Sequence, residues 1–215
     1  MRVADGIFRV DGVRVGNAYV VASADGLLVV DTGIRGSAKR IVALARGLGR
    51  RATDIRYIVL THADLDHAGS AAALKALTHA ALAVHELEAP VVAGAQPPKG
   101  GRRMAALYRL LRFRPVQADL LLKEGDTIAG FRVMHVPGHT AGSIALYRDD
   151  GVVFSGDTLL SDKRGSVRPP DPRLALDPAQ TLASAERIKG LPMTLLLPGH
   201  GAPVRFERRL PSEGG

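Results

Sequence analysis

Two histidines and two aspartates fall within six positions of one short segment. The segment is Thr61-His62-Ala63-Asp64-Leu65-Asp66-His67-Ala68-Gly69, and it directly follows a strand-like run that ends at Leu60. Imidazole and carboxylate are strong ligands for divalent metal ions, and this spacing suits a loop that wraps around such ions. A regular helix would direct positions i and i+2 to different sides, and a regular strand would separate i+4 from i+5. The spacing therefore predicts a metal-binding turn at a strand end, with a helix that begins only after Gly69.

Three later segments each place one more possible ligand at a glycine-containing turn. They are Val136-Pro137-Gly138-His139-Thr140, Phe154-Ser155-Gly156-Asp157-Thr158 and Leu197-Pro198-Gly199-His200-Gly201. Each follows an apolar, strand-like run. A lone histidine or aspartate at such a turn is more often structural than metal-bound. His139, Asp157 and His200 therefore gain their weight from the larger pattern to which they belong.

In residue types and in order, this pattern resembles the metallo-β-lactamase superfamily. The motif of that family is His-x-His-x-Asp-His, followed by a histidine, a bridging aspartate and a final histidine. The resemblance covers nearly the whole chain, starting near Asn17 and the run Val29-Val30-Asp31-Thr32-Gly33. It implies two metal sites that share the bridging residue Asp157, the first formed by His62, Asp64 and His139 and the second by Asp66, His67 and His200.

Asp64 departs from the family pattern, because that position of the motif is usually histidine. A carboxylate can still coordinate, but two divalent ions would then face three aspartates, and a bridging hydroxide would make the cluster about neutral. We expect the first ion to be a weaker Lewis acid and the site to favour harder ions. The expected cofactor is a pair of zinc ions, with iron or manganese as the alternatives. A second interpretation is that Asp64 does not coordinate and that only one ion binds tightly.

Asp31 and the three remaining histidines are not expected to bind metal directly. Asp31 ends a buried strand and is expected to orient a ligand through a hydrogen bond, although a simple turn aspartate is the alternative. His79 follows a helix end, where a histidine interacts with free carbonyl groups. His85 and His135 lie at strand ends near the site, and we expect a structural role for both, with contact to the substrate or to a metal ligand as the alternative.

The composition narrows the location and the chemistry. A chain of 215 residues suits one domain, residues 1–215, with a full core. The absence of cysteine excludes disulfides, thiolate ligands and a cysteine nucleophile. The start of the chain, from Met1 to Phe8, has no apolar signal segment, and no run is long enough to span a bilayer, so we expect a cytoplasmic protein that does not bind membranes. The expected partner is a small-molecule substrate, and the net charge of +8 would suit an anionic one. Nucleic acid is an open alternative rather than the expected partner, because the basic residues are spread along the chain.

The hydrophobic pattern predicts short strands that alternate with helices. The expected strands are 7–10, 13–15, 18–21, 27–30, 55–60, 82–84, 131–136, 143–147, 152–154 and 195–197. The expected helices are 37–48, 70–77 and 178–188, the last with Asp177 as N-cap and Pro178 at its first position. This order supports an α/β fold with ligands on strand-end loops. The family resemblance implies more, namely a four-layer αββα sandwich.

An insertion after the break at 96–101 is expected to form a short helix. Its apolar residues keep helical spacing and form one stripe, which consists of Met104, Leu107, Tyr108 and Leu111. Its basic residues fall on another side, and these are Arg102, Arg109 and Arg112. One hypothesis is a lid over the active-site mouth whose arginines favour anionic substrates. The alternative is a helix that packs on the domain and exposes a solvated basic face.

The resemblance implies a dinuclear metal-dependent hydrolase, in which a metal-bound hydroxide attacks a carbonyl or phosphorus centre. Asp66 is expected to hold this nucleophile and relay a proton, besides binding a metal ion. The expected substrate is a small thioester, lactone or ester. The chain continues only briefly after His200, so the glutathione-binding domain of larger hydroxyacylglutathione hydrolases is not expected.

Other functions on the same fold stay open. A persulfide dioxygenase would use a single iron ion, whereas seven ligand positions are filled here. A phosphodiesterase or nuclease would agree with the basic charge, but we find no additional RNA-processing motifs in the sequence. A non-catalytic binding module would need a broken ligand set, and Asp64 is the only unusual member.

Overall fold

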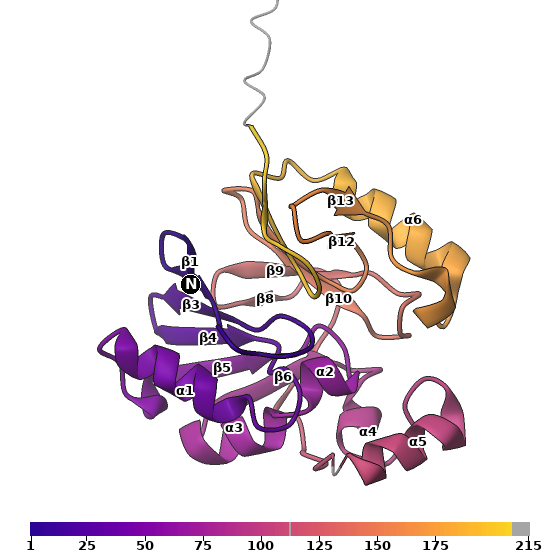
Figure 1. The fold of residues 1–215 in the computed structure, drawn as a ribbon, viewed down its shortest axis with the longest axis horizontal. Coiled ribbons are helices and arrows are strands. Elements are labelled where there is room, and N and C mark those ends of the chain that lie inside the picture. Colours follow the sequence, from indigo (N-terminus) through magenta and orange to yellow (C-terminus); the bar gives the residue numbers. More distant parts are fainter. Residues whose placement is uncertain (112, 208–215) are drawn as a thin grey trace, which may run out of the picture.

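Two β-sheets pack face to face, and helices cover the outer face of each (Figure 1). This computed structural model describes residues 1–111 and 113–207. In the first sheet the strands follow one another in chain order, as β1 (Arg2–Ala4), β2 (Ile7–Arg9), β3 (Tyr19–Ser23), β4 (Gly26–Val30), β5 (Ile55–Val59), β6 (Ala81–His85) and β7 (Leu120–Leu122). From β4 to β7 neighbouring strands run parallel, and the earlier pairs are antiparallel.

The second sheet is built from the later half of the chain. Its strands lie in the order β15 (Val204–Arg205), β14 (Leu195–Pro198), β11 (Val152–Gly156), β10 (Ile144–Tyr147), β9 (Phe131–His135) and β8 (Thr127–Ile128). Two short strands, β12 (Leu160–Ser161) and β13 (Val167–Arg168), form a separate hairpin-like pair. The β11–β14 pair is parallel, which brings the loops that follow these two strands to the same edge.

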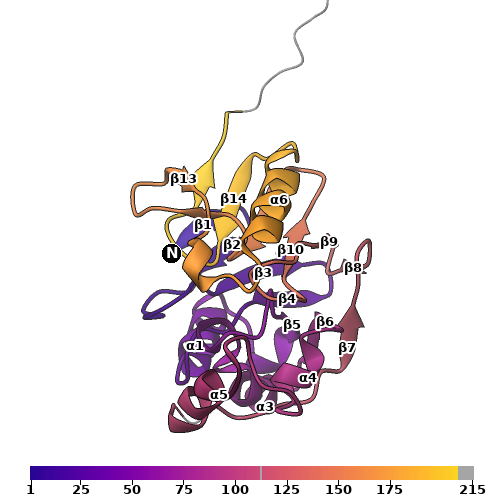
Figure 2. The same ribbon diagram turned by 90° about the vertical axis from the view of Figure 1, so that its right-hand side faces the viewer.

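The helices are short, and most lie against the outer faces of the sheets (Figure 2). They are α1 (Ala38–Gly47), α2 (Leu65–Ala68), α3 (Ala71–Thr78), α4 (Ala89–Val92), α5 (Gly101–Leu110) and α6 (Pro178–Lys189), with 3-10 turns at Ala52–Asp54 and Pro172–Leu174. No helix within the described residues combines the length and the hydropathy needed to cross a bilayer.

Alternation along the strands divides the core into three layers. In β3 and β4, Val20 and Val29 face the helices α1 and α3, whereas Tyr19 and Leu28 face the second sheet. On the far side of the second sheet, a third cluster packs against α6 and includes Ile188. The layers are therefore helix, sheet, sheet and helix, which confirms the αββα sandwich.

Most elements agree with the sequence pattern. The helices expected at 37–48, 70–77 and 178–188 form as α1, α3 and α6, with shifts of one residue at some ends. Pro178 occupies the first position of α6, and the side chain of Asp177 accepts a hydrogen bond from the backbone N–H of Gln180.

The strand expected at 13–15 was a wrong prediction. Gly12 and Gly16 bracket it with φ of +75° and +70°, so the chain bends on both sides and forms a loop. A Cβ on Gly16 would lie 2.6 Å from the backbone oxygen of Asp66. The loop therefore lies directly against the metal-binding motif, and only glycine permits that approach.

The prediction that helix begins only after Gly69 was also wrong. The short helix α2 lies inside the motif, and the backbone N–H groups of His67 and Ala68 donate to the oxygen of Asp64. His62 and Asp64 precede this helix, so a single helical face does not have to present all four ligand candidates. One helical turn instead brings Asp66 and His67 back toward the preceding loop.

Candidate metal centre

Five strand ends meet at one edge of the sandwich and carry the predicted side chains there. Asp31 directly follows β4, and the loop with His62 and Asp64 follows β5. In the second sheet, the loop after β9 carries His139, and the residues directly after β11 and in the turn after β14 are Asp157 and His200. Five buried apolar strands thus hold the loops in place, and the polar side chains converge where these strands end.

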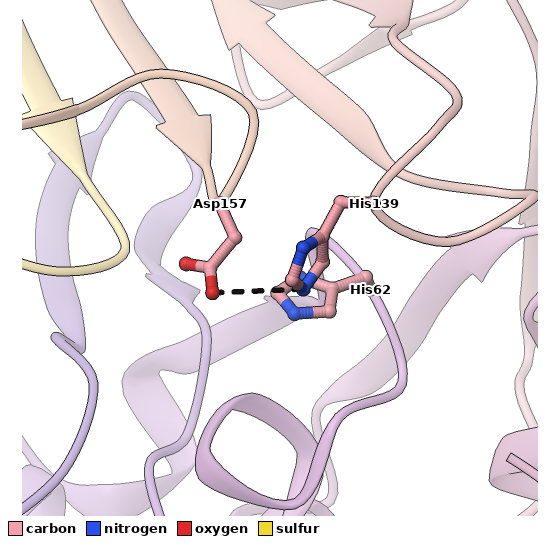
Figure 3. Close-up of side chains that lie close together, drawn as sticks. All are labelled: His62, His139 and Asp157. Carbon is pink, nitrogen blue, oxygen red and sulfur yellow. Dashed lines mark ion pairs between the residues drawn. The ribbon is translucent and has the colours of Figure 1, made fainter. Parts of the chain in front are cut away.

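The first group of side chains combines His62, His139 and Asp157. One possible ligand atom from each lies within 4.8 Å of the others, and Figure 3 shows the two imidazole rings turned toward the Asp157 carboxylate. The Nε2 atom of His139 lies 3.6 Å from Oδ2 of Asp157. Asp64 extends this group, because its Oδ2 lies 3.6 Å from Nε2 of His62 and 3.1 Å from Nε2 of His139.

The second group combines Asp66, His67 and His200, whose ligand atoms also lie within 4.8 Å of one another. Nε2 of His200 lies 3.0 Å from Oδ2 of Asp66, and Nε2 of His67 lies 3.7 Å from the same oxygen. Asp157 contacts both histidines of this group at 3.3 Å, through Oδ1 to His67 and through Oδ2 to His200. Asp157 therefore lies between the two groups.

These spacings match the edges of a metal coordination shell. Two ligand atoms on a tetrahedral zinc ion lie about 3.4 Å apart when each is about 2.1 Å from the ion. The seven distances above fall between 3.0 and 3.7 Å. The set of donors, neutral imidazoles and carboxylates, is also one that divalent transition-metal ions accept.

Buried polar atoms without hydrogen-bond partners also indicate that these side chains hold metal ions. Among the described residues, Nε2 of His62, Nε2 of His67 and Oδ1 of Asp157 are fully buried and form no hydrogen bond. A polar atom that is buried without a partner costs free energy, and native structures rarely retain one without a reason. All three atoms belong to the two groups, so cations held between these side chains would satisfy them.

Asp31 fixes the orientation of two of the histidines. Its buried carboxylate accepts hydrogen bonds from the backbone N–H and the hydroxyl of Thr61, both at 2.8 Å, and lies 2.8 Å from Nδ1 of His67. Since the Thr61 hydroxyl donates to Asp31, it accepts from Nδ1 of His62 at 3.0 Å. Both imidazoles therefore donate from Nδ1 and turn Nε2 into the centre, where it can bind a cation in place of a proton.

The charges of the cluster favour bound cations. Burial by itself would raise the pKa of Asp157, but the charge of His67 and a hydrogen bond from His200 hold that pKa well below its usual range. Burial lowers the pKa of His200, yet its contacts with Asp157 and Asp66 raise it to about 9. Without metal, protons on the histidines thus compensate the carboxylates. Metal ions would replace those protons, as ligand sites for divalent cations generally require.

Glu88 connects the two loops of the first group, and sequence reasoning missed it. Its side chain is buried, and its two oxygens accept from the backbone N–H groups of Ala63 and Gly142, both at 2.8 Å. Ala63 separates His62 from Asp64, and Gly142 lies in the loop that carries His139. One carboxylate from the start of α4 thereby ties together the segments that would hold the first ion.

Lys99 is a second residue that sequence reasoning missed. Its Nζ lies 2.5 Å from Oδ2 of Asp64 and 2.5 Å from Nε2 of His139, with 17% of the side chain exposed. No motif marks this lysine, since it lies in the proline- and glycine-rich break before α5. The only sequence signal is its place within the basic insertion.

The turn that carries His200 is held by the start of the chain. The side-chain amide of Asn17 donates to the backbone oxygens of Pro198 and Gly201, at 2.9 and 3.0 Å. A Cβ on Gly199 would lie 2.2 Å from Oδ1 of Asp157. Glycine is therefore required for this turn to approach the carboxylate between the two groups.

The helix α5 agrees only in part with the expected apolar stripe. Tyr108 is buried, and its hydroxyl donates to the backbone oxygen of Ala63 at 3.1 Å. Leu111 follows the helix end and is 50% exposed, so its place in the stripe was a wrong prediction. Arg109 is exposed, whereas Arg112 and the side chain of Arg102 lie outside the described residues. The helix packs on the metal loop through Tyr108, and substrate selection by its arginines stays a prediction.

The remaining histidines lie outside both groups. His79 caps α3 with φ of +58°. His85 and His135 stack on each other with ring centroids 4.2 Å apart. Burial lowers the pKa of His85, and the charge of His135 adds to this effect. Neither side chain joins the residues around Asp157.

Comparison with known proteins identifies the family of the chain. The model of the metallo-beta-lactamase superfamily matches residues 11–200. A probable metallo-hydrolase of Bacillus subtilis, YflN, is 27% identical over 89% of this chain and 83% of its own length. A hydroxyacylglutathione hydrolase of Cupriavidus taiwanensis is 35% identical over 81% of this chain, and the match spans 59% of that hydrolase.

Solved structures agree with the sequence relatives. TTHA1623 in a di-iron-bound form superposes with a TM-score of 0.68 and 31% identity, over 92% of this chain and 93% of that one. BJP-1, a subclass B3 metallo-beta-lactamase of Bradyrhizobium japonicum, superposes with a TM-score of 0.71 and 28% identity, over 93% of this chain and 76% of that one. The fold, the convergent side chains and these relatives lead to one conclusion: the chain belongs to the metallo-β-lactamase superfamily of metal-binding hydrolases.

Proposed function

We propose that this protein is a hydrolase with two metal ions that cleaves a small thioester, lactone or ester. One observation carries the proposal: two groups of ligand atoms with coordination-shell spacing share the partly buried carboxylate of Asp157. The first ion would be held by His62, Asp64 and His139, and the second by Asp66, His67 and His200. The partnerless atoms of His62, His67 and Asp157 support both assignments.

The side chains of the centre would have different roles in the reaction. A pair of divalent ions bound there would lower the pKa of water toward neutrality and polarise the carbonyl oxygen of the substrate. Asp157 would hold the two halves at a fixed separation, since its two oxygens contact both. Asp31 and Thr61 keep the histidine rings in place, so the ligand atoms need little reorganisation during a reaction.

Asp66 is the carboxylate best placed to serve the reaction itself. Its side chain is 24% exposed, compared with 18% for Asp64 and 11% for Asp157. Burial raises its pKa, but contacts with His200 and His67 outweigh this and lower the pKa to about 2. Asp66 is therefore ionised at neutral pH and open to the solvent side. We propose that it orients the attacking water and takes up its proton.

We propose zinc as the resident metal, with iron or manganese as the alternatives. Four imidazoles suit zinc, whereas the additional carboxylate of Asp64 makes the first half harder than a histidine would. The similar protein TTHA1623 is a di-iron form, and its metal is a property of that protein. Metal analysis of protein purified without added metal identifies the resident metal. Two equivalents of zinc, with no gain in rate from iron or manganese, would support zinc.

Removal and return of metal test the proposed reaction. Chelation is expected to abolish hydrolysis of a panel of thioesters, lactones and neutral esters, because the two groups consist of histidines and aspartates and the sequence contains no cysteine. Stoichiometric metal should restore the rate. Hydrolysis that survives complete metal removal would contradict the proposal. Oxygen consumption with a persulfide, or cleavage of phosphodiesters alone, would favour one of the other reactions on this fold.

We further propose that the substrate carries an anionic group. A cavity of about 590 Å³ opens beside His200, and its lining includes Arg9, Arg14 and Lys163. The single carboxylate in that lining, Asp11, is paired with the N-terminal ammonium group at 2.7 Å. Neither Arg14 nor Lys163 forms an ion pair with another described residue. The wall of this cavity thus presents positive charge next to a predicted metal ligand, which favours a carboxylate on the substrate.

The double variant Arg14→Gln/Lys163→Gln tests this surface. We expect KM to rise about tenfold for an ester with a free carboxylate, since each exposed charge pair contributes about 1 kcal/mol or less. KM for the neutral methyl ester of the same compound should not change. The matched control is Lys39→Gln/Arg46→Gln, which removes two exposed charges from α1. Equal effects of both double variants would show that only the net charge matters.

A further inference from the structure

The segment before α5 places a side-chain cation inside the first half of the centre. The Nζ atom of Lys99 contacts Oδ2 of Asp64 and Nε2 of His139, each at 2.5 Å. These two atoms also face His62, whose Nε2 lies 3.6 Å from the same Asp64 oxygen. The lysine is anchored from outside the site, because it belongs to neither of the two ligand loops. Among the ligand candidates, the described residues show Lys99 contacts with the first group only.

The contact with His139 is decisive for metal binding. An ammonium group only donates hydrogen bonds, so Nε2 of His139 must be the acceptor. A neutral imidazole nitrogen has a single lone pair, which can receive this hydrogen bond or bind a cation, but not both. Repulsion between the ammonium group and a divalent ion adds to this exclusion. Lys99 in this position and an ion bound to His139 are therefore alternatives.

The local chain permits the lysine to leave. Lys99 is followed by Gly100 and Gly101, with φ of +84° and +63°, so the chain is left-handed where it enters α5 at Gly101. The helix has its own anchor on the metal loop, the hydrogen bond from Tyr108 to Ala63. The long side chain of Lys99 can therefore withdraw while α5 stays in place, without breaking a helical hydrogen bond.

We propose that Lys99 is a tethered competitor of the first metal ion: its ammonium group occupies the Asp64 and His139 half until a divalent ion displaces it. The inference rests on the proposed pair of metal ions. It explains how the additional carboxylate of Asp64 is compensated when that half holds no ion. It also sets an order of loading, in which the half with Asp66, His67 and His200 fills first and the first half binds more weakly.

Metal titration of the full-length, metal-free protein tests this proposal. Calorimetry of zinc binding to wild type should show a tight binding step and a weaker one. In Lys99→Gln, we expect the weaker step to tighten about tenfold or more, because the ion no longer displaces a charge-assisted hydrogen bond. Lys99→Arg keeps the charge and should keep the weaker step. Lys39→Gln, which removes an exposed lysine from α1, is the matched control and should behave as wild type.

The outcomes separate this inference from the proposed function. Two binding steps in wild type, with the weaker step unchanged or weakened in Lys99→Gln, would overturn the competition while leaving the metal pair intact. Absence of any zinc binding in all four proteins would overturn the metal pair and the competition with it. A crystal structure of the zinc-loaded wild type gives a second readout that does not depend on a variant. Nζ of Lys99 should lie beyond hydrogen-bond distance of His139, and an ion bound to His139 with this contact intact would refute the proposal.

Discussion

Asp157→Ala is expected to lower kcat/KM by about a thousandfold, because this one carboxylate contacts both halves of the proposed centre. Metal ions supply several kcal/mol of transition-state stabilisation, and each 1.36 kcal/mol corresponds to a factor of ten in rate. Without Asp157 neither half would keep its full set of candidate ligands, so both halves would hold a divalent ion more weakly. We therefore expect the loss mainly in kcat, together with a lower metal content after dialysis.

Thermal unfolding distinguishes a lost metal centre from a damaged fold. A ligand that binds only the folded state stabilises it, by about 2.7 kcal/mol at a concentration of 100 times Kd. Zinc should therefore raise the Tm of wild type clearly and the Tm of Asp157→Ala little. Asp25→Ala is the matched control, since it removes an exposed carboxylate from the turn between β3 and β4. Near-normal turnover in Asp157→Ala would refute the assignment of the bridging residue.

The elements that carry the site were predictable because their signals are local. Short apolar runs form β4, β5, β11 and β14, as their patterns indicate, and polar residues follow each run. Parallel pairing of β4 with β5 and of β11 with β14 then brings the following residues to one edge. The positions of the ligand candidates at strand ends therefore predicted that these side chains converge at one edge.

The errors arose where tertiary contacts override a local pattern. Val13 and Val15 alternate as in a strand, but the chain bends at Gly12 and Gly16 to lie against Asp66. Alternation alone does not distinguish these two outcomes. Asp31 adopts φ of +59°, which is uncommon for a residue other than glycine, and the bonds to Thr61 and His67 compensate for it. No property of the isolated sequence indicates this conformation.

Two side chains of the centre were invisible in the sequence because their partners are distant along the chain. Glu88 bonds the backbone of Ala63 and Gly142, 25 and 54 residues away. Lys99 contacts His139, 40 residues away, from the proline- and glycine-rich break before α5. Neither residue belongs to a motif, so only the folded chain shows that both act on the first half of the site. The first half thus has additional contacts, from Glu88 and Lys99, and it is also the half where Asp64 departs from the family pattern.

Asp66→Asn is expected to lower kcat by about 10² to 10⁴, the usual contribution of a positioned proton acceptor. Asparagine keeps the shape of the side chain and one carbonyl oxygen for a metal ion, but it cannot take up a proton. Asp66 has the most exposed side chain of the three carboxylates between the histidines, so a water molecule and a substrate can reach it. We therefore expect the loss in kcat rather than in KM.

The measurement has to separate proton transfer from metal binding, because Asp66 also lies 3.0 Å from Nε2 of His200 within the second group. Rates should be taken at increasing zinc concentration, with the bound metal determined on the same samples. If Asp66 takes the proton, the variant stays slow when both sites are full. If added zinc returns the rate to that of wild type, Asp66 acts only as a ligand, and the proton must go to another group. Asp64 is then the alternative to consider, since its carboxylate lies in the first half and would be free of Lys99 once an ion is bound there.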